Sequence, residues 1–161
     1  MSKAGAPYQI YWSHYTQVQC QPPGHFVSLA LVNSLTRVIV VDDDAPVRRA
    51  LARLLTMAGY AVSTCSSGTD CLEMLRTMHF DCVILDLQMP LMSGFEVLSR
   101  LKDLGLHTPV VVMTGFDSPE SRERAASLGV TGYLTKPVAR RTLLAAMRAA
   151  MAAQPPPLAG S

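Results

Sequence analysis

From Arg37 onward, the sequence alternates short runs of continuous apolar residues with longer segments whose apolar residues recur every three or four positions. Continuous apolar runs such as 38–41 and 82–85 are typical of strands buried on both faces, and the three-to-four spacing is typical of helices. Strands that alternate with helices are joined by crossovers and form a parallel sheet. We therefore expect an α/β fold, a doubly wound five-stranded parallel sheet of (βα)5 type with helices on both faces.

The elements of this fold can be placed from local signals. Asp44 can cap the first helix, which Gly59 ends, Ser93 opens the third helix, and Ser118 followed by Pro119 opens the fourth. We expect strands at 37–42, 60–65, 81–86, 108–115 and 131–135, and helices at 45–59, 67–79, 92–105, 118–129 and 137–153.

The two ends of the chain do not follow this pattern. Residues 1–36 contain one lysine, no acidic residue and no clear period. We expect either a flexible leader without a fold of its own or an artefact of a start codon assigned too early, with translation beginning near Val32. Residues 37–153 are expected to form one domain, and 154–161 a proline-rich tail. Since only this tail follows the last helix, we expect a single-domain protein without a DNA-binding output domain.

Composition and charge exclude several classes of protein. Apolar residues make up 49% of the chain and charged residues 16%, so a folded core is expected and global disorder is not. A net charge of +2 is too small to indicate binding to nucleic acid or to an anionic membrane. The apolar run Phe26–Val32 is too short to span a bilayer and lacks the flanks of a secretory signal. We expect a cytoplasmic protein with no membrane or nucleic-acid partner.

The cysteines support a reducing compartment. None of them forms a metal-binding C-x-x-C pair, and three lie in apolar or helical settings. We interpret all four as free buried thiols: Cys20, Cys65, Cys71 and Cys82.

Polar residues end the buried strands and should meet at one edge of the sheet. Asp42 and Asp43 end the first strand, Asp86 the third and Thr114 the fourth, while Lys136 follows the fifth. Two carboxylates about 4 Å apart repel each other by roughly 4 kcal/mol at an effective dielectric near 20. A hard divalent cation removes this conflict, and Mg²⁺ binds through a few carboxylates together with phosphate.

The remaining polar groups suit phosphoryl chemistry. Lys136 can pair with a carboxylate or a phosphoryl oxygen, and Thr114 can donate one hydrogen bond. Phosphoryl transfer needs mainly positioning and charge neutralisation, and a carboxylate can be the nucleophile. Asp86 is the best candidate because it stands alone on the middle strand, with Lys136 and the acidic pair around it.

Four stretches, VIVVDDDAPVRRAL, DCVILDLQMPLMSGFEVL, PVVVMTG and GYLTKP, occur in this order and resemble the receiver domain of two-component response regulators. The resemblance covers about residues 37–153 and implies a flavodoxin-like strand order, 2-1-3-4-5. It implies that Asp86 accepts a phosphoryl group from a sensor histidine kinase or a histidine phosphotransfer protein. Mg²⁺ would be held by Asp43, Asp86 and the backbone carbonyl of Gln88, with Asp42 acting largely through water.

The resemblance also implies a switch. Thr114 and Lys136 would contact the phosphoryl group, and Tyr133 would rotate inward as Thr114 is drawn to that group. A downstream protein would then read the face formed by the helix at 118–129, the strand at 131–135 and the helix at 137–153. In such domains the positions of Gln88 and Phe116 influence how fast water removes the phosphoryl group.

Two further expectations concern the loops of this site. Gly115 leaves access for the phosphodonor, and we hypothesise that Phe116 shields the site. The Lys136–Pro137 peptide bond is expected to be cis, as the resemblance implies.

Two other functions compete with a phosphorylated receiver that catalyses only its own phosphorylation and dephosphorylation. Asp42-x-Asp44 superficially supplies the D-x-D of phosphatases with an aspartate nucleophile, although Ala45 and Pro46 follow where such enzymes usually have threonine or valine. A constitutive binding module that has lost phosphorylation is the third possibility, and the intact set of five site residues argues against it.

Overall fold

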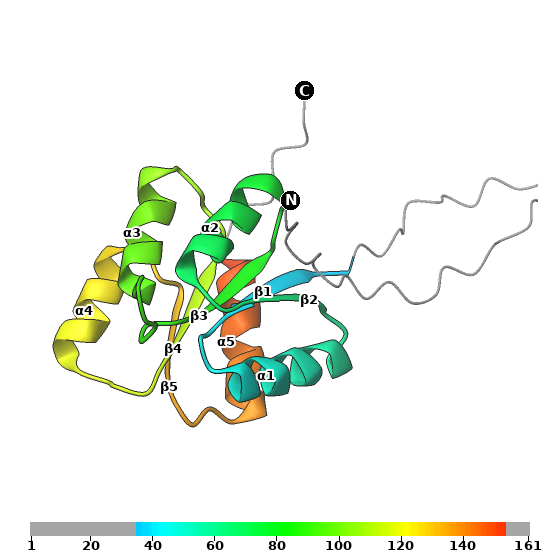
Figure 1. The fold of residues 1–161 in the computed structure, drawn as a ribbon. Helices are drawn as coiled ribbons and strands as arrows, with labels where there is room; N and C mark the ends of the chain where they lie inside the picture. The colour runs from blue at the N-terminus through cyan, green and yellow to red at the C-terminus, as the bar shows by residue number, and fades with distance from the viewer. Residues whose placement is uncertain (1–34, 154–161) are drawn as a thin grey trace, which may run out of the picture. The chain divides into compact units, whose positions relative to one another are not determined.

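The computed structural model describes residues 35–153, which are the coloured part of the ribbon in Figure 1. Nearly all of the expected leader, the whole expected tail and Cys20 lie outside these residues. Within 35–153, no helix has the length and apolar character needed to cross a membrane.

Five parallel strands form one sheet at the centre of the domain. The strands are β1 (Arg37–Val41), β2 (Ala61–Cys65), β3 (Cys82–Asp86), β4 (Val110–Thr114) and β5 (Gly132–Thr135). Their order in the sheet is β2-β1-β3-β4-β5, and every neighbouring pair is parallel. The α/β class and the strand order expected from the sequence are therefore confirmed.

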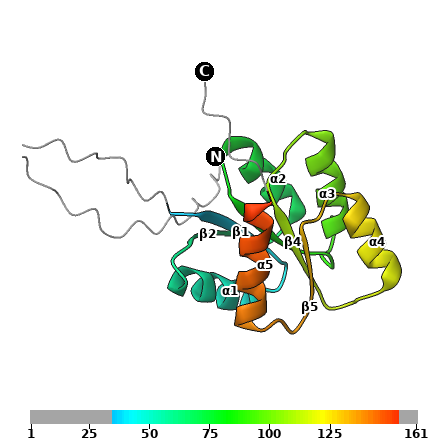
Figure 2. The ribbon, with the colours of Figure 1, turned by 180° about the vertical axis from the view of Figure 1, so that it is seen from behind.

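Five helices connect the strands and cover both faces of the sheet. They are α1 (Ala45–Met57), α2 (Gly68–Thr77), α3 (Gly94–Asp103), α4 (Pro119–Ser127) and α5 (Arg140–Ala152). Helices α1 and α5 lie side by side on one face, and α2 and α3 lie on the other, as Figures 1 and 2 show from opposite sides.

The core has two parts because the central strands are buried on both faces. Val38, Val40 and Ile84 face α1 and α5 and pack against Leu55 and Met147. The alternate positions of the same strands face the other way: Ile39, Val41, Val83 and Leu85 pack toward α2 and α3. The continuous apolar runs of the sequence thus supply one side chain to each layer in turn.

Side chains cap four of the five helices at their starts. Asp44 caps α1, accepting from the backbone N–H of Val47, and Ser118 caps α4 ahead of Pro119, as the sequence predicts. Ser67 caps α2. Ser93 and Glu96 form a reciprocal capping box at the start of α3.

The last helix begins later than the sequence suggested. The prediction began it at Pro137, but α5 starts at Arg140 after Ala139, which makes no side-chain cap. The Lys136–Pro137 peptide bond is cis, as expected, and residues 137–139 lie outside the helix.

Candidate functional site

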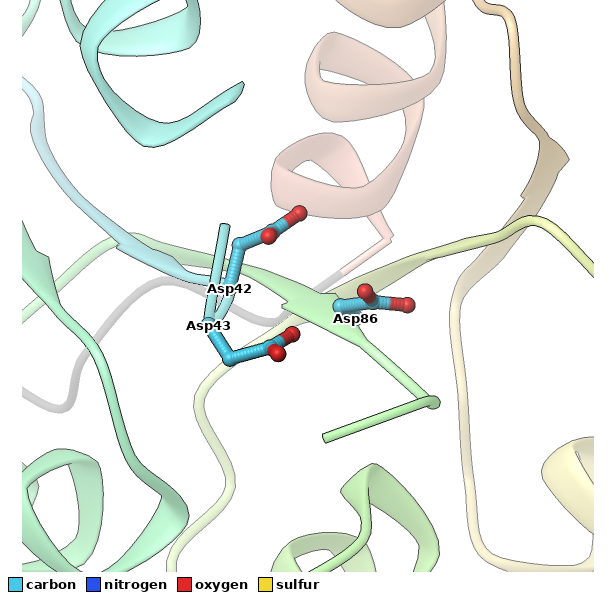
Figure 3. Close-up of side chains that lie close together, drawn as sticks. All are labelled: Asp42, Asp43 and Asp86. Atoms are coloured by element: carbon cyan, nitrogen blue, oxygen red, sulfur yellow. The ribbon is translucent and has the colours of Figure 1, made fainter. Parts of the chain in front are cut away.

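The carboxyl ends of β1 and β3 bring three aspartates together. Asp42 and Asp43 directly follow β1, and Asp86 is the last residue of β3. The two strands are neighbours in the sheet, with Val41 paired to Leu85, so the residues that follow lie side by side. Figure 3 shows the three side chains clustered at this edge. In open parallel sheets such an edge, where the strand order reverses, is the usual place for a binding site.

The three carboxylates lie close enough to share one ion. One oxygen from each can be chosen so that all three lie within 4.8 Å of one another. Asp42 and Asp86 are buried, with 2% and 5% of their surface exposed, and Asp43 is exposed. Ionised carboxylates at this spacing repel one another strongly unless a cation neutralises them.

Lys136 supplies part of that neutralisation. Its Nζ donates to Asp42 Oδ2 at 2.7 Å and to Asp86 Oδ2 at 2.8 Å. Burial lowers the pKa of the Lys136 ammonium, but its bonds to the two carboxylates and their charges outweigh burial and leave this pKa above its usual value. Lys136 is therefore a cation that holds the two buried carboxylates in place.

Backbone N–H groups take the other oxygen of each buried carboxylate. Asp44 N–H donates to Asp42 Oδ1 at 2.9 Å, and Gln88 N–H donates to Asp86 Oδ1 at 3.1 Å. Asp42 and Asp86 are therefore oriented by one lysine and one backbone N–H each. A carboxylate held in this way can react or ligate without first reorganising.

The donor set fits a hard divalent cation. Three carboxylates and one ammonium leave two formal negative charges at this edge, and all the candidate ligand atoms are oxygens. Mg²⁺ prefers oxygen ligands and is commonly bound by one or two carboxylates together with phosphate. Asp42, Asp43 and Asp86 are the side chains that could hold it. The expected role of the Gln88 carbonyl stays a prediction, since the bond the structure describes at this residue is that of its N–H.

Thr114 reaches the same edge, but its hydroxyl is bonded elsewhere. Thr114 is the buried last residue of β4. Its Oγ1 donates to the Phe116 carbonyl at 3.0 Å and accepts from the Phe116 N–H at 3.1 Å. The hydroxyl thus holds the loop that leads to α4. For the Thr114 hydroxyl to donate to a phosphoryl group, it must first break its hydrogen bond to the Phe116 carbonyl.

The loop after β4 borders a hollow of about 290 Å³, whose wall includes the two residues that directly follow β3. Thr114, Gln88 and Phe116 contribute to its wall, and 65% of Phe116 is exposed. A Cβ on Gly115 would lie 3.3 Å from Gln88 Oε1, so Gly115 lets the Gln88 side chain lie close to this loop.

Tyr133 on β5 is half-buried and contacts the start of α4. Its hydroxyl is hydrogen-bonded to Ser121 Oγ at 2.8 Å, and the guanidinium carbon of Arg122 lies 4.7 Å from the centre of its ring. Arg122 donates to both oxygens of Asp117, and Thr135 donates to one of them at 3.1 Å. Tyr133 is thus linked to the loop after β4 through α4.

Two residues of the site were missed by the sequence analysis. Arg48 on α1 donates from one nitrogen to the backbone carbonyls of Asp42 and Asp43, at 2.6 and 2.8 Å. Gly94 begins α3 so close to β3 that a Cβ there would lie 2.3 Å from the Asp86 carbonyl oxygen. No local signal marks either role, because each depends on how a helix packs against a strand end.

Asp44, by contrast, bonds a backbone N–H of α1 through its carboxylate. Its side chain caps α1 and is not among the three clustered carboxylates. This placement weakens the reading of Asp42-x-Asp44 as the acidic pair of a phosphatase.

Comparison with known proteins gives one consistent result. Residues 38–148 match the family model described as "Response regulator receiver domain". The chain is 41% identical over 113 residues to the response regulator MprA of Mycobacterium ulcerans (strain Agy99), an alignment that covers 70% of this chain and 49% of that protein. The MprA protein of Mycobacterium avium (strain 104) is 40% identical, with 50% of its length covered. The chain spans about half the length of the curated relatives it matches.

Solved structures agree with this match. The Vibrio cholerae chemotaxis protein CheY4 is 33% identical and superposes with a TM-score of 0.68, covering 73% of this chain and 99% of that one. The structure titled FixJ-N is also 33% identical, with a TM-score of 0.69 and coverage of 74% and 95%.

Proposed function

The chain belongs to the response regulator receiver family of two-component systems, and from this membership we propose that Asp86 accepts a phosphoryl group from a phosphohistidine. The donor would be a sensor histidine kinase or a histidine phosphotransfer protein. The observation that carries the proposal is the arrangement of Lys136, whose Nζ bonds one oxygen of Asp42 and one oxygen of Asp86 at the acidic edge.

The proposed transfer uses groups that are already oriented. An oxygen of Asp86 attacks phosphorus, a P–O bond forms, and the P–N bond to the donor imidazole breaks. Gln88 N–H keeps the Asp86 carboxylate in place. Lys136 can leave Asp86 for a phosphoryl oxygen while it keeps its bond to Asp42. The charge on Asp86 moves onto the phosphoryl oxygens, where a cation and hydrogen-bond donors stabilise it.

Mg²⁺ is the expected cofactor, held by Asp42, Asp43, Asp86 and the Gln88 backbone carbonyl. When bound, it supplies positive charge to the phosphoryl oxygens. The chain would catalyse only its own phosphorylation and the later hydrolysis of the phosphoaspartate, and would act on no other substrate.

We propose that the switch runs through Thr114 and Tyr133. The Thr114 hydroxyl exchanges the Phe116 carbonyl for a phosphoryl oxygen, and the loop that it held is freed to move. Tyr133 then leaves Ser121 and turns inward. The surface of α4, β5 and α5 would change and bind a downstream protein. The free buried thiols of Cys65, Cys71 and Cys82 support a reducing compartment such as the cytoplasm.

Phosphorylation of the full chain tests the proposal directly. The protein is incubated with Mg²⁺ and acetyl phosphate and examined by intact-mass spectrometry, beside Asp86→Asn and the control Asp103→Asn on α3. We expect one phosphoryl adduct in the wild type and in the control, and none in Asp86→Asn. A folded wild type that takes up no phosphoryl group would instead support the constitutive binding module.

A further inference from the structure

Helices α1 and α5 differ in charge from the other three helices. Each of α2, α3 and α4 carries both signs, with an acidic residue in its first turn and a basic residue in its last. Within their bounds, α1 and α5 contain no acidic residue at all. They carry six arginines: Arg48, Arg49, Arg53, Arg140, Arg141 and Arg148.

The basic residues of α1 and α5 are not placed where a positive charge would stabilise a helix end. Arg140 and Arg141 are the first two residues of α5, at the end where the helix dipole is positive and where Ala139 provides no side-chain cap. Neither α1 nor α5 has a basic residue in its last turn, where a cation would be favourable. Residues that lower the stability of their own helix are typical of functional sites.

Five of the six arginines are exposed and unpaired. The side chains of these five form no hydrogen bond, ion pair or ring contact with any residue that the structure describes: Arg49, Arg53, Arg140, Arg141 and Arg148. We call these five residues the arginine surface.

The arginine surface lies on two neighbouring helices that cover one face of the sheet, as Figure 2 shows. Arg141 and Arg148 are two turns apart on α5, a rise of about 10 Å, and Arg49 and Arg53 are one turn apart on α1, about 6 Å. The buried side of each helix is formed by other residues, Leu51 and Leu55 on α1 and Leu143, Met147 and Ala150 on α5. Both arginine pairs are therefore free to meet a partner.

We propose that the arginine surface binds the acidic face of a partner protein. Charge complementarity favours an acidic partner. The exposed small residues Ala145, between Arg141 and Arg148, and Ala149, directly after Arg148, let a helix approach closely. This inference does not rest on phosphorylation of Asp86. It concerns a surface that shares only α5 with the face proposed for the downstream target.

Other polyanions fit this surface less well. Asp43 and Asp44 are exposed directly before α1 and would repel a continuous phosphate backbone, whereas a protein can place its acidic residues away from them. A membrane surface is disfavoured because insertion needs large apolar side chains. Of the large apolar residues that are exposed in the described part of the chain, Met57 is the only one on either helix.

The test measures binding of the full chain to a synthetic helical peptide with glutamates at i, i+4 and i+7 on one face. We expect amide NMR shifts confined to α1 and α5. Arg141→Gln combined with Arg148→Gln should weaken binding about three- to tenfold. The matched control is Arg76→Gln with Arg100→Gln on α2 and α3, which removes the same charge from exposed positions and should change the affinity less than about twofold.

Several outcomes would overturn the proposal. Equal weakening in the control pair, or equal binding of a scrambled peptide of the same composition, would show only general charge attraction. Tighter binding to duplex DNA or to anionic phospholipid vesicles than to the acidic peptide would show that the partner belongs to another class. Self-association of the chain that is lost with the arginines would make a second copy the occupant.

Two further variants separate binding from structure and from phosphorylation. Arg140→Gln with Arg141→Gln should keep or raise the melting temperature, because it removes cations from a helix N-terminus; a clear fall would show that these arginines are structural and would overturn the proposal. Asp86→Asn should bind the peptide as the wild type does. Failure of phosphorylation and failure of peptide binding are thus observed separately.

Discussion

Asp42, Asp43 and Asp86 have the same chemistry but different environments. Asp42 and Asp86 are buried, and each bonds Lys136 and one backbone N–H. Asp43 is exposed and has no hydrogen bond to its carboxylate from any residue in the described part of the chain. Removing a paired, buried carboxylate leaves Lys136 without one of its partners, whereas removing Asp43 takes away only repulsion.

Asp43→Asn should therefore stabilise the protein when no divalent cation is present. We expect its melting temperature in EDTA to rise by about 2–4 °C and the stabilisation by Mg²⁺ to be largely lost, because a ligand stabilises only the state that binds it. Thermal unfolding followed by circular dichroism, with and without Mg²⁺, measures both effects. Asp44→Asn is the control, and a melting temperature for Asp43→Asn equal to or below that of the wild type in EDTA would contradict this account.

Phe116 offers a second test at a single side chain. Its ring lies at the wall of the hollow beside Thr114 and is largely exposed. If this ring shields the phosphoaspartate from water, Phe116→Ala should lose its phosphoryl group several-fold faster than the wild type, and Phe116→Leu should lie between the two. The decay of the phosphorylated mass after removal of acetyl phosphate measures the rate. An unchanged rate in Phe116→Ala would rule out shielding.

The start of α3 shows how a helix end supports the site. The capping box of Ser93 and Glu96 fixes the first turn of α3, and Gly94 lies against the Asp86 carbonyl. The helix therefore begins directly behind Asp86, the proposed phosphoacceptor. Its cap also contains an exposed carboxylate, and this makes the stability of α3 depend on pH.

Bonds from the backbone N–H and the hydroxyl of Ser93 hold the pKa of Glu96 below its usual value. A carboxyl whose pKa is lower in the folded state stabilises the fold above its unfolded pKa, near 4.5, and this contribution is lost as pH falls through the folded pKa. Glu96→Gln should therefore lose less stability than the wild type between pH 5 and about pH 3.

Urea unfolding at several pH values measures how the free energy of unfolding changes with pH, with Glu73→Gln on α2 as the control. Ser93→Ala should cost about 1 kcal/mol at pH 7 through loss of the cap. If the free energy of unfolding of Glu96→Gln changes with pH as that of the wild type does, the capping box does not make the stability of α3 depend on pH.

The proposed switch depends on contacts that join separate elements. Tyr133 on β5 is bonded to Ser121 on α4, and Arg122 joins its ring to Asp117 in the loop after β4. If Tyr133 turns inward on phosphorylation, these contacts must be lost. They would then favour the unphosphorylated arrangement of the whole domain.

Arg122→Ala should make switching easier. A partly exposed cation–π contact contributes about 0.5–1 kcal/mol, so the apparent affinity for beryllofluoride with Mg²⁺ should rise about two- to fivefold. Amide NMR titration measures this affinity. Arg124→Ala is the matched control, because Arg124 stacks on Phe95 instead and not on Tyr133. An affinity in Arg122→Ala at or below that of the wild type would mean that the switched state keeps the Arg122 contacts.

The buried thiols report on the cooperativity of the fold. Cys82 belongs to the core beneath α1 and α5, and Cys65 and Cys71 belong to the core beneath α2 and α3. Burial, with the nearby charge of Asp81, raises the pKa of the Cys82 thiol to about 12, and the hydrogen bond of the Cys71 S–H to Cys65, together with burial, raises the pKa of Cys71. Cys71 and Cys82 therefore contain little reactive thiolate in the folded protein at neutral pH.

In a Cys20→Ser background, we expect no alkylation of the native protein by iodoacetamide at pH 8. The three thiols should become reactive together across a single urea transition, because the two cores share the same strands. Peptide mass spectrometry identifies each labelled site. Labelling of Cys65 and Cys71 at lower urea than Cys82 would show that the two layers unfold separately.

The sequence by itself determined the class of the fold, the order and approximate place of the elements, and the residues at the strand ends. These follow from local periodicity, from capping residues such as Asp44 and Ser93, and from the rule that parallel strands end at one edge. The strand order and the proposed role of Asp86 as phosphoacceptor came from the resemblance to a family and not from the pattern alone.

Only the tertiary structure decided how these residues meet. It placed Lys136 between Asp42 and Asp86, turned the Thr114 hydroxyl toward Phe116, and brought Arg48 and Gly94 to the strand ends. It also placed α1 and α5, the two helices that carry the arginine surface, on one face of the sheet. Periodicity describes neighbours along the chain, whereas these contacts join residues of different elements, and their distances depend on how the helices pack against the sheet.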